Sequence, residues 1–556
     1  MLCAAALSFA GPAHAQVRSG AAVPGGGGQL IDRNLAIIGI RAPAQQLRRV
    51  RSLTPRPPGF QLTGAEAVRI ARAAAASKGV RGGRARVWTR GDGSWRVSLY
   101  KGGAEKAQVY VSDADARATE IWTGRQVDTY LARGYSGQFV GKLNAPWLWL
   151  PLCLLFVLPF IDPRRPFRLL HLDLLVLVAG LGLSHFFFER GNLDASVPLV
   201  YPVLGYVLAR MLYAGFRPRE RAEPLVPWAR PGWLLAGIAL LVVFRIVLSI
   251  ADPHVIDVGY AGVIGADRLT HGHELYAGGF PQVRGDTYGP FDYIAYVPFE
   301  LVFPWHGVWD SLPAARAAAI AFDLLTMVAL FFVGRRLRPG REGRLLGVVL
   351  AYAWAAFPYA VYTTQSAAND ALVSLCVTAA LAAFALPWLR GAFIGLGAAA
   401  KFAPLALAPL FATGRESLGT RNVRQALVVV AALAMVLLVT FVPLIPPGGV
   451  HDLYDRTVGY QASRSSPFSI WGLAPGLHPL RPLVEAAAAL LALGVAVVPR
   501  RRSLVQVAAL GAAVLVAVQL PAKHWFYIYV VWFAPLMFAA LFAEHTRLFG
   551  RERRTA

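Results

Sequence analysis

Long apolar runs, interrupted by short polar connections, make up most of the chain after about residue 145. Each run holds about 17 to 22 residues, the length that an α-helix needs to cross about 30 Å of hydrocarbon. The predicted spans are residues 145–161, 169–187, 196–215, 233–251, 313–334, 343–362, 370–388, 424–445, 484–499, 503–521 and 525–544. This pattern predicts a polytopic α-helical membrane protein with about 11 spans.

Arginine-rich connections such as DPRRPFR and GRRLRPGREGR alternate with connections that carry little positive charge. Because basic residues concentrate in cytoplasmic loops, the alternation predicts a cytoplasmic C-terminus with a basic tail at 546–556. One apolar segment, from Gly391 to Phe411, has basic flanks on both sides, with Lys401 and Pro404 near its middle. We therefore predict a re-entrant pair of half-helices there, a form tolerated where irregular backbone lines a cavity.

The chain before the spans has a different, soluble character. Residues 1–15 end in Ala-His-Ala and form a signal-like segment, and residues 16–60 form a predicted flexible leader. A capping box at Thr63 and Glu66 opens a helix, and alternating strands with turns at Asp92 and Asp113 follow. The pattern predicts a small exported α+β domain over residues 61–144. Its segments WRVSLY, VYVSDADARATEIWTG and YLARGYSGQFVG resemble a PepSY-like domain.

Composition agrees with a membrane protein. Hydrophobic residues make up 56% of the chain and charged residues only 15%, and the mean hydropathy is +0.48. The net charge of +24 then reflects cytoplasmic loops and does not indicate a nucleic-acid partner. Cys3, Cys153 and Cys376 lie in apolar segments with no metal or disulfide spacing.

Two carboxylates follow the apolar run 233–251, namely Asp252 and Asp257. The loop from 252 to 311 holds eight acidic and two basic residues, so we expect it to be extracytoplasmic. A carboxylate there can accept the proton of an attacking hydroxyl, which is general-base catalysis, although a polar residue ending a helix explains it equally well. Asp257 is the first candidate, and Asp252, which Pro253 follows, is the second.

An ordered series of polar motifs continues to the C-terminus. DVGYAG, HGHELY, GDTYGPFDYIAYVPF, TTQSAAND, AAAKFAPLAL, SRSSPFSIWGL and AKHWFYIYVVWFAPL follow one another between about residues 230 and 545. This series resembles the polytopic glycosyltransferases of the GT-C superfamily, closest to the polyprenol-phosphate-mannose-dependent mannosyltransferases. The resemblance implies a catalytic aspartate after the first core span, a position that Asp257 matches, and a polyprenyl phosphate as leaving group. It assigns residues 217–545 to the core and leaves three additional spans at 145–216.

A leaving phosphate needs cationic partners. The predicted phosphate-binding residues are Lys401, Arg464, Lys523 and His524. Lys401 could instead snorkel to the headgroups, and His524 could be an interfacial histidine. The predicted sugar or acceptor contacts are His273, Glu274, Asp286, Tyr288, Asn369 and Asp370. Several of these could equally shape their loops, and His271 with His273 lacks a third ligand, so no metal site is predicted. Arg245 and Asp323, both within spans, are predicted to pair.

These observations predict an integral-membrane glycosyltransferase of the plasma membrane with an extracytoplasmic active site. It would move a hexose or pentose, most readily mannose, from a polyprenyl-phosphate donor to a hydroxyl of a glycolipid, glycan or protein. We predict no cofactor, although a divalent cation is possible, and no nucleic-acid partner. The alternatives are a secondary transporter and a membrane sensor with an exported ligand-binding domain. Transporters usually show paired interruptions in two related halves, whereas this chain has one re-entrant candidate.

Overall fold

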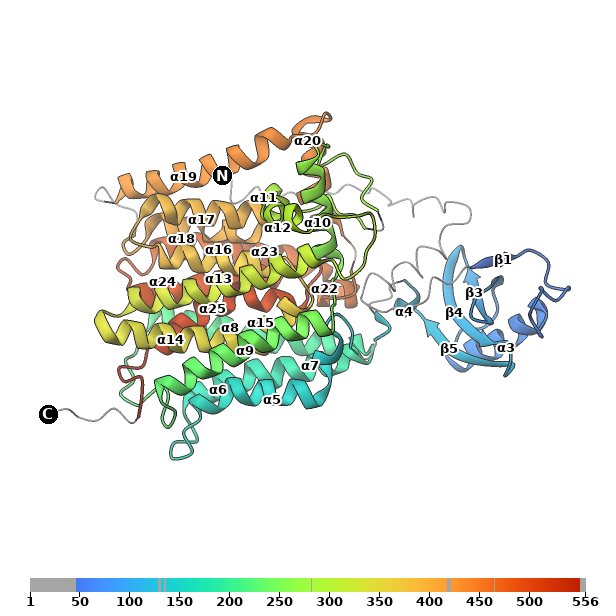
Figure 1. Cartoon of the computed structure of the whole chain (residues 1–556), viewed down its shortest axis with the longest axis horizontal. Helices are drawn as coiled ribbons and strands as arrows, with labels where there is room; N and C mark the ends of the chain where they lie inside the picture. The colour runs from blue at the N-terminus through green and yellow to red at the C-terminus, as the bar shows by residue number, and fades with distance from the viewer. Residues whose placement is uncertain are drawn as a thin grey trace. The chain divides into compact units, whose positions relative to one another are not determined.

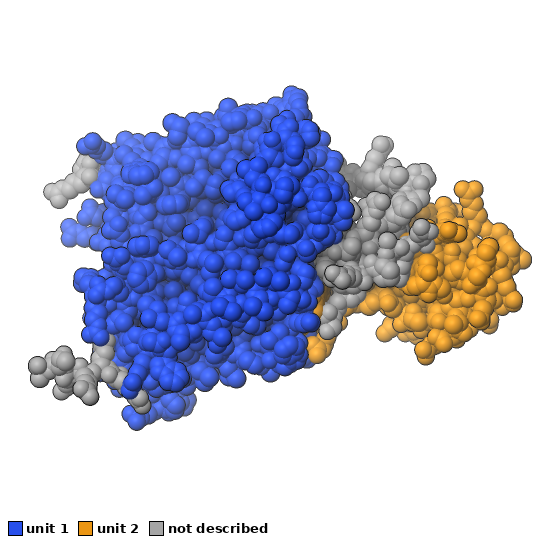
Figure 2. All heavy atoms as spheres, in the orientation of Figure 1, with its two compact units in different colours: residues 1–11, 139–186, 194–556 blue, residues 12–138, 187–193 orange. Residues whose placement is uncertain are grey.

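The computed structural model describes residues 47–128, 132–134, 137–281, 283–417, 422–464 and 466–550. The chain forms two compact units, which Figure 2 shows in different colours. The larger unit contains the membrane helices, and the smaller one lies within residues 12–138 together with 187–193. The signal-like segment, most of the predicted leader and residues 551–556 of the tail lie outside the described residues.

The smaller unit is an antiparallel sheet with one face covered by a helix. Its strands are β1 (Arg48–Val50), β2 (Arg84–Thr89), β3 (Ser94–Lys101), β4 (Ala104–Ser112) and β5 (Arg117–Thr123), and its helices are α3 (Gly64–Ser77) and α4 (Arg125–Asp128). The strands pair in sequence order. The connection from β1 to β2 contains α3, and the other three connections are short turns. The capping box of Thr63 and Glu66 is confirmed at the start of α3. Strand β1 lies within the range predicted as a flexible leader, and its Val50 packs against the core.

Buried Asp113 fastens the helix to this sheet. It begins the turn after β4, as the sequence pattern predicts, but its carboxylate points inward. The carboxylate accepts hydrogen bonds from Trp95 Nε1 at 2.8 Å and from the backbone N–H groups of Gln61 and Leu62 at 2.6 and 2.9 Å. Three donors satisfy a buried carboxylate without a cation, so Asp113 has a structural role.

Apolar helices make up the larger unit. The apolar elements, which include several short ones, are α5 (Pro146–Val157), α6 (Leu169–Leu175), η4 (Val176–Gly180), α7 (Leu181–Glu189), α8 (Leu193–Phe216), α9 (Pro231–Ala251), α13 (Pro313–Leu337), α14 (Gly340–Ala356), α15 (Pro358–Gln365), α16 (Asp370–Ala382), α17 (Pro387–Ala400), η5 (Ala403–Leu407), α18 (Ala408–Thr413), α19 (Val423–Phe441), α23 (Arg481–Val497), α24 (Leu504–Gln519) and α25 (Val530–Ala543). Among the described residues, six helices are long and apolar enough to cross a membrane, or seven if α14 and α15 form one bent span. Shorter apolar helices accompany them. The chain is a multi-pass membrane protein, and the total of about 11 spans stays a prediction.

Short helices carry most of the polar motifs. They are η2 (Gly141–Asn144), η3 (Leu158–Phe160), α10 (Asp257–Thr270), α11 (Pro290–Ile294), α12 (Val297–Val302), η6 (Val442–Leu444), α20 (Gly449–Tyr454), η7 (Asp455–Gly459), α21 (Tyr460–Ser463), α22 (Ile470–Leu473), η8 (Pro475–Leu480) and η9 (Tyr527–Tyr529). Figure 1 shows α10, α20 and α22 at one end of the long helices. The fold therefore collects motifs that are far apart in the sequence at the same end of this unit.

The segment from Gly391 to Phe411 turns back on itself at Lys401. Helix α17 ends at Ala400, and η5 and α18 return, so that Gly414 lies beside Arg390 near the start of α17. A Cβ atom at Gly414 would lie 3.0 Å from Arg390 Nη1. The predicted turn is thus confirmed, while the placement of this hairpin relative to the bilayer stays a prediction.

The predicted pair of Arg245 and Asp323 is confirmed. Arg245 Nη1 lies 3.0 Å from Asp323 Oδ2, and both side chains are almost fully buried. Arg245 Nη2 also donates to the carbonyl oxygens of Trp354 and Ala355 at 3.2 and 2.9 Å. These carbonyls lie at the bend between α14 and α15, where Pro358 has no N–H to donate. Arg245 therefore binds two backbone carbonyls at the bend, of which that of Trp354 also accepts the N–H of Phe357 at 3.2 Å, and it pairs with one carboxylate.

We expect Arg245→Met to destabilise the protein by about 3 to 5 kcal/mol, because it leaves a buried carboxylate without its cation. The double variant Arg245→Met with Asp323→Asn should recover part of that loss, since no buried charge remains unpaired. Thermal unfolding in detergent micelles measures both. If the single variant melts at the wild-type temperature, the ion pair makes no net contribution to stability.

Candidate active site

A cavity of about 230 Å³ lies where several polar motifs meet. It is lined by the loop before α11, the tip of the α17–η5 hairpin, residues near α21, and the segment that leads into α25. All four residues predicted to bind phosphate line this cavity, namely Lys401, Arg464, Lys523 and His524. The structure therefore brings together cationic and imidazole groups from three separate motifs. Tyr288, one of the predicted sugar or acceptor contacts, lines the same cavity.

Two of the cations are available to a ligand. In the part of the chain that the structure describes, the side chains of Arg464 and Lys523 form no hydrogen bond or ion pair. Burial and neighbouring Arg481 lower the pKa of Lys523. A cavity with uncompensated positive charge favours an anionic group such as a phosphate.

His524 differs from the other three residues. Its Nδ1 atom lies 2.7 Å from Ser466 Oγ, and its ring packs edge-on against Phe468 and Phe526. Burial, together with the positive charges of Arg464 and Lys401, lowers the pKa of His524 well below its ordinary value. The imidazole is therefore neutral at pH 7 and offers a hydrogen bond rather than the cationic charge predicted from the sequence.

Asp257 is the first residue of α10, and its Oδ1 atom accepts a hydrogen bond from the N–H of Val258 at 3.0 Å. The residue is exposed, yet the protein around it excludes enough water to raise the pKa of its carboxyl. Arg464 and Lys401 partly oppose that rise, since their positive charges favour the carboxylate. Asp257 thus lies within electrostatic range of two cavity-lining cations while remaining accessible.

Glycines in the DVGYAG motif allow α10 to approach its neighbours closely. A Cβ atom at Gly259 would lie 2.4 Å from the carbonyl oxygen of Ala367, and one at Gly262 would lie 2.9 Å from the ring of Tyr296. Real side chains do not fit at such distances. The glycine spacing therefore fixes where the N-terminus of α10, and with it Asp257, is held.

Asp252 has a different environment. Its Oδ2 atom accepts a hydrogen bond from the backbone N–H of Lys142 at 2.6 Å, and its Oδ1 atom lies 3.4 Å from His254 Nε2. Asp252 does not line the cavity described above. The second candidate base is thus engaged in contacts that hold the end of α9.

Five other predicted contacts do not line this cavity among the described residues. Asp286 is ion-paired with Arg456 at 2.7 Å. His273 and Glu274 are exposed. Asn369 and Asp370 are fully buried and bonded to other side chains. Of the predicted sugar or acceptor contacts, only Tyr288 is placed to touch a ligand in the cavity.

The sequence analysis missed Asp292 and Trp532. Fully buried Asp292 accepts a hydrogen bond from Asn369 Nδ2 at 2.6 Å, and Trp532 Nε1 donates to Asp370 at 2.8 Å. Burial raises the pKa of Asp292 to about 7, although Lys401 acts in the opposite direction. The signal for Asp292 was a lone acid in the apolar stretch PFDYIAYVPF. An acid in such a stretch is expected to be buried and hydrogen-bonded.

Comparison with known families gives one match. Residues 287–523 match the sequence model of glycosyltransferase family 87. No curated protein matches the chain. The matched segment contains Tyr288, Lys401, Arg464 and Lys523, whereas Asp257 and the elements from α5 to α9 precede it. The match supports a membrane glycosyltransferase of the GT-C type.

Proposed function

We propose that this protein transfers a sugar from a polyprenyl-phosphate donor to an acceptor hydroxyl on the extracytoplasmic side of the membrane. Mannose is the first sugar to test, and other hexoses and pentoses follow. The observation that carries the proposal is the cavity, where Arg464 and Lys523 are free to bind an anion. The accessible carboxylate of Asp257 lies within the electrostatic field of Arg464 and Lys401. The polyprenyl chain can stay in the bilayer while its phosphate reaches the cavity.

The proposed reaction is a direct displacement. The acceptor oxygen attacks the anomeric carbon, and Asp257 accepts the hydroxyl proton. The bond between the anomeric carbon and the phosphate oxygen breaks, and its electron pair leaves with the phosphate. Cations that stabilise the developing negative charge lower the barrier, and Arg464, Lys523 and Lys401 are the candidates. His524, as a neutral imidazole, is proposed to orient the phosphate through a hydrogen bond.

The exported domain is part of this proposal as a PepSY-like module. Its antiparallel sheet with a covering helix supports that assignment. We propose that it acts on the outer side, near the acceptor, because the basic connections favour an outward N-terminal region.

The test is transfer by purified full-length protein in lipid nanodiscs. Radiolabelled mannosyl, glucosyl and arabinosyl polyprenyl phosphates are offered with a bacterial envelope extract as acceptor, and nucleotide sugars serve as the comparison. We expect labelled product from at least one lipid-linked donor and none from nucleotide sugars. A folded, monodisperse protein that transfers nothing from any lipid-linked donor would contradict the proposal and favour a transporter or a sensor.

Arg464→Gln should raise the KM for the donor by about 10- to 100-fold, because a charge-assisted hydrogen bond to phosphate contributes about 1.5 to 3 kcal/mol. The KM for the acceptor should change little, since the phosphate belongs to the donor. Initial rates at varied donor and acceptor concentrations measure the two values. An unchanged donor KM would remove Arg464 from phosphate binding.

A further inference from the structure

Lys401 is held in place, in contrast to Arg464 and Lys523. Its ammonium Nζ lies 2.7 Å from Asp370 Oδ1. The rings of Tyr288, Tyr529 and Trp532 surround it, with centroids at 5.3, 5.7 and 5.6 Å. One carboxylate and three aromatic faces define a single position for the ammonium group. The snorkelling alternative considered for Lys401 is not the arrangement observed.

Asp370 contacts Lys401 on the side of the ammonium group that faces away from the cavity. It is the first residue of α16, it is fully buried, and it does not line the cavity. Its Oδ1 atom receives two hydrogen bonds, one from Lys401 and one from Trp532 Nε1 at 2.8 Å. A lysine ammonium has three N–H groups, so the bond to Asp370 leaves two for a ligand.

The surrounding segments strengthen this arrangement. The N–H of Gly289 donates to the carbonyl of Ala400 at 3.1 Å, which joins the loop of Tyr288 to the hairpin tip. A Cβ atom at Gly289 would lie 2.0 Å from the carbonyl oxygen of Ala399. Asn369, adjacent to Asp370, donates to buried Asp292 at 2.6 Å. The loop before α11, the hairpin tip and the start of α16 are therefore bonded to one another around Lys401.

We propose that Asp370 is a positioning residue that fixes the Lys401 ammonium at the cavity wall, so that its two remaining N–H groups bind the leaving phosphate. This inference rests on the proposed function. Arg464 and Lys523 supply uncompensated charge, whereas Lys401, neutralised by Asp370, supplies oriented hydrogen bonds. Because the ammonium group already has a fixed position, substrate binding does not have to immobilise the lysine side chain. A purely structural ion pair is the competing explanation.

The first experiment compares Asp370→Asn and Asp370→Glu with wild type in the transfer assay. A positioning role predicts a donor KM about tenfold higher in Asp370→Asn and an intermediate value in Asp370→Glu, which retains a carboxylate. The acceptor KM should not change. A purely structural role lowers only the number of active molecules, so kcat falls while both KM values stay the same, and that result would overturn the proposal. Asp455→Asn is the control, because Asp455 is an exposed acid that is paired with His451.

The second experiment does not require transfer. Folded protein is treated with acetic anhydride at fixed pH, and acetylation of Lys401 is measured by peptide mass spectrometry, with unpaired Lys523 as the internal reference. Loss of the carboxylate should make Lys401 react at least about fivefold faster in Asp370→Asn, while Lys523 is unchanged. Equal Lys401 reactivity in both proteins would overturn the positioning role whichever sugar donor is used. If wild type transfers no sugar but Lys401 still reacts faster in Asp370→Asn than in wild type, the result contradicts the proposed function and leaves the positioning role intact.

If Asp370→Asn does not fold, Trp532→Phe replaces it in both experiments. That change removes one hydrogen bond to Asp370 Oδ1 and keeps an aromatic ring beside Lys401. The same pattern, with smaller shifts, supports the proposal, and wild-type values in both assays would overturn it.

Discussion

Asp257→Asn is expected to lower kcat for sugar transfer by about 10²- to 10⁴-fold, the contribution that a positioned general base typically makes. Asparagine has nearly the same shape but cannot accept the proton of the attacking hydroxyl. The donor should still bind, because Arg464 and Lys523 are unchanged and Arg464 loses a competing negative charge nearby. Single-turnover transfer with saturating donor measures the loss of rate separately from binding.

Asp252→Asn is the matched comparison for that variant. Asp252 lies five residues earlier but is bonded to the backbone of Lys142, so transfer per folded molecule should stay close to wild type. The opposite pattern, with transfer lost in Asp252→Asn and retained in Asp257→Asn, would exchange the roles of the two aspartates.

The pH dependence of transfer follows from the same carboxylate. The surrounding protein excludes water from the Asp257 carboxyl and raises its pKa, so the base becomes protonated at a higher pH than an ordinary aspartate would. Activity should therefore fall as the pH decreases through this raised pKa, which gives kcat an acidic limb. Arg464 lowers the pKa of Asp257, so Arg464→Gln should move that limb to higher pH. If the acidic limb of the kcat profile lies at the same pH in wild type and Arg464→Gln, a group other than Asp257 controls the fall in activity.

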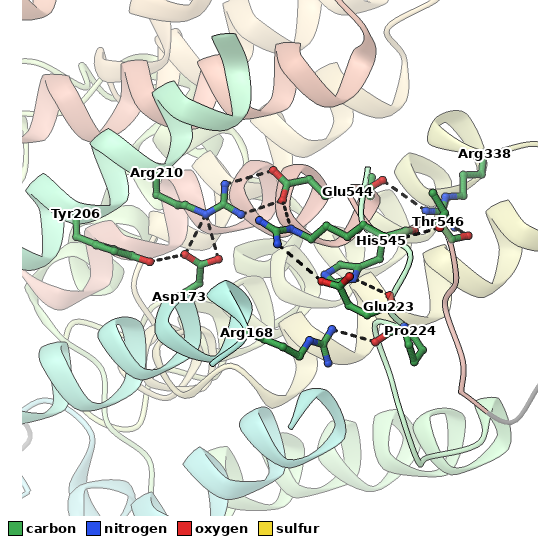
Figure 3. Close-up of polar contacts among 12 residues, drawn as sticks. Arg168, Asp173, Tyr206, Arg210, Glu223, Pro224, Arg338, Glu544, His545 and Thr546 are labelled. Atoms are coloured by element: carbon green, nitrogen blue, oxygen red, sulfur yellow. Dashed lines mark hydrogen bonds and ion pairs between the residues drawn. The ribbon is translucent and has the colours of Figure 1, made fainter. Parts of the chain in front are cut away.

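The second large effect is expected from Arg210→Met. Figure 3 shows Arg210 between two carboxylates, those of Asp173 on α6 and of Glu544 just after α25. Its Nε atom lies 3.1 Å from Asp173 Oδ1, and its Nη2 atom lies 2.9 Å from Glu544 Oε2. All three side chains are almost completely buried. Removing the cation leaves buried Asp173 without its ion-pair partner and leaves Glu544 with Arg221, whose Nε atom lies 3.0 Å from Glu544 Oε2. We therefore expect a loss of about 3 to 5 kcal/mol of stability.

Thermal unfolding followed by size-exclusion chromatography measures that loss. Exposed Arg341→Met is the control for removing an arginine, and it should melt as wild type does. The triple variant Arg210→Met, Asp173→Asn, Glu544→Gln should recover part of the stability, because it leaves no unpaired charge among the three. An Arg210→Met protein as stable as wild type would show that the network does not hold these helices together.

This network involves the three additional spans at 145–216, which lie outside the core predicted from the sequence. Besides Arg210, hydroxyl groups connect these helices to the candidate site. Tyr527 Oη lies 2.7 Å from Ser184 Oγ on α7 and 3.0 Å from Ser196 Oγ on α8. Tyr201 on α8 accepts a hydrogen bond from the N–H of Ile470 at 3.0 Å. The additional helices therefore pack against the segments that carry Lys523 and the SRSSPFS motif.

Local sequence determined much of this architecture. Runs of apolar residues of membrane-crossing length predict the helices, because in hydrocarbon the backbone must satisfy its own hydrogen bonds. The capping box at Thr63 and the break at Lys401 are likewise set by neighbouring residues, so both could be predicted. The sequence also identified the cation types that a leaving phosphate needs, and four such residues do share a cavity.

Tertiary structure alone decided which polar residues meet and what each one does. Asp252 and Asp257 look alike in the sequence. In the structure, the Asp252 carboxylate accepts a hydrogen bond from the backbone N–H of Lys142, which belongs to a distant segment. Asp257 instead is exposed and lies close to cations that line the cavity. Asp370 resembles a substrate contact until Trp532 and Lys401 are seen to share its carboxylate. Such roles depend on contacts between residues 31 to 162 positions apart, and local patterns carry no information about contacts of that kind.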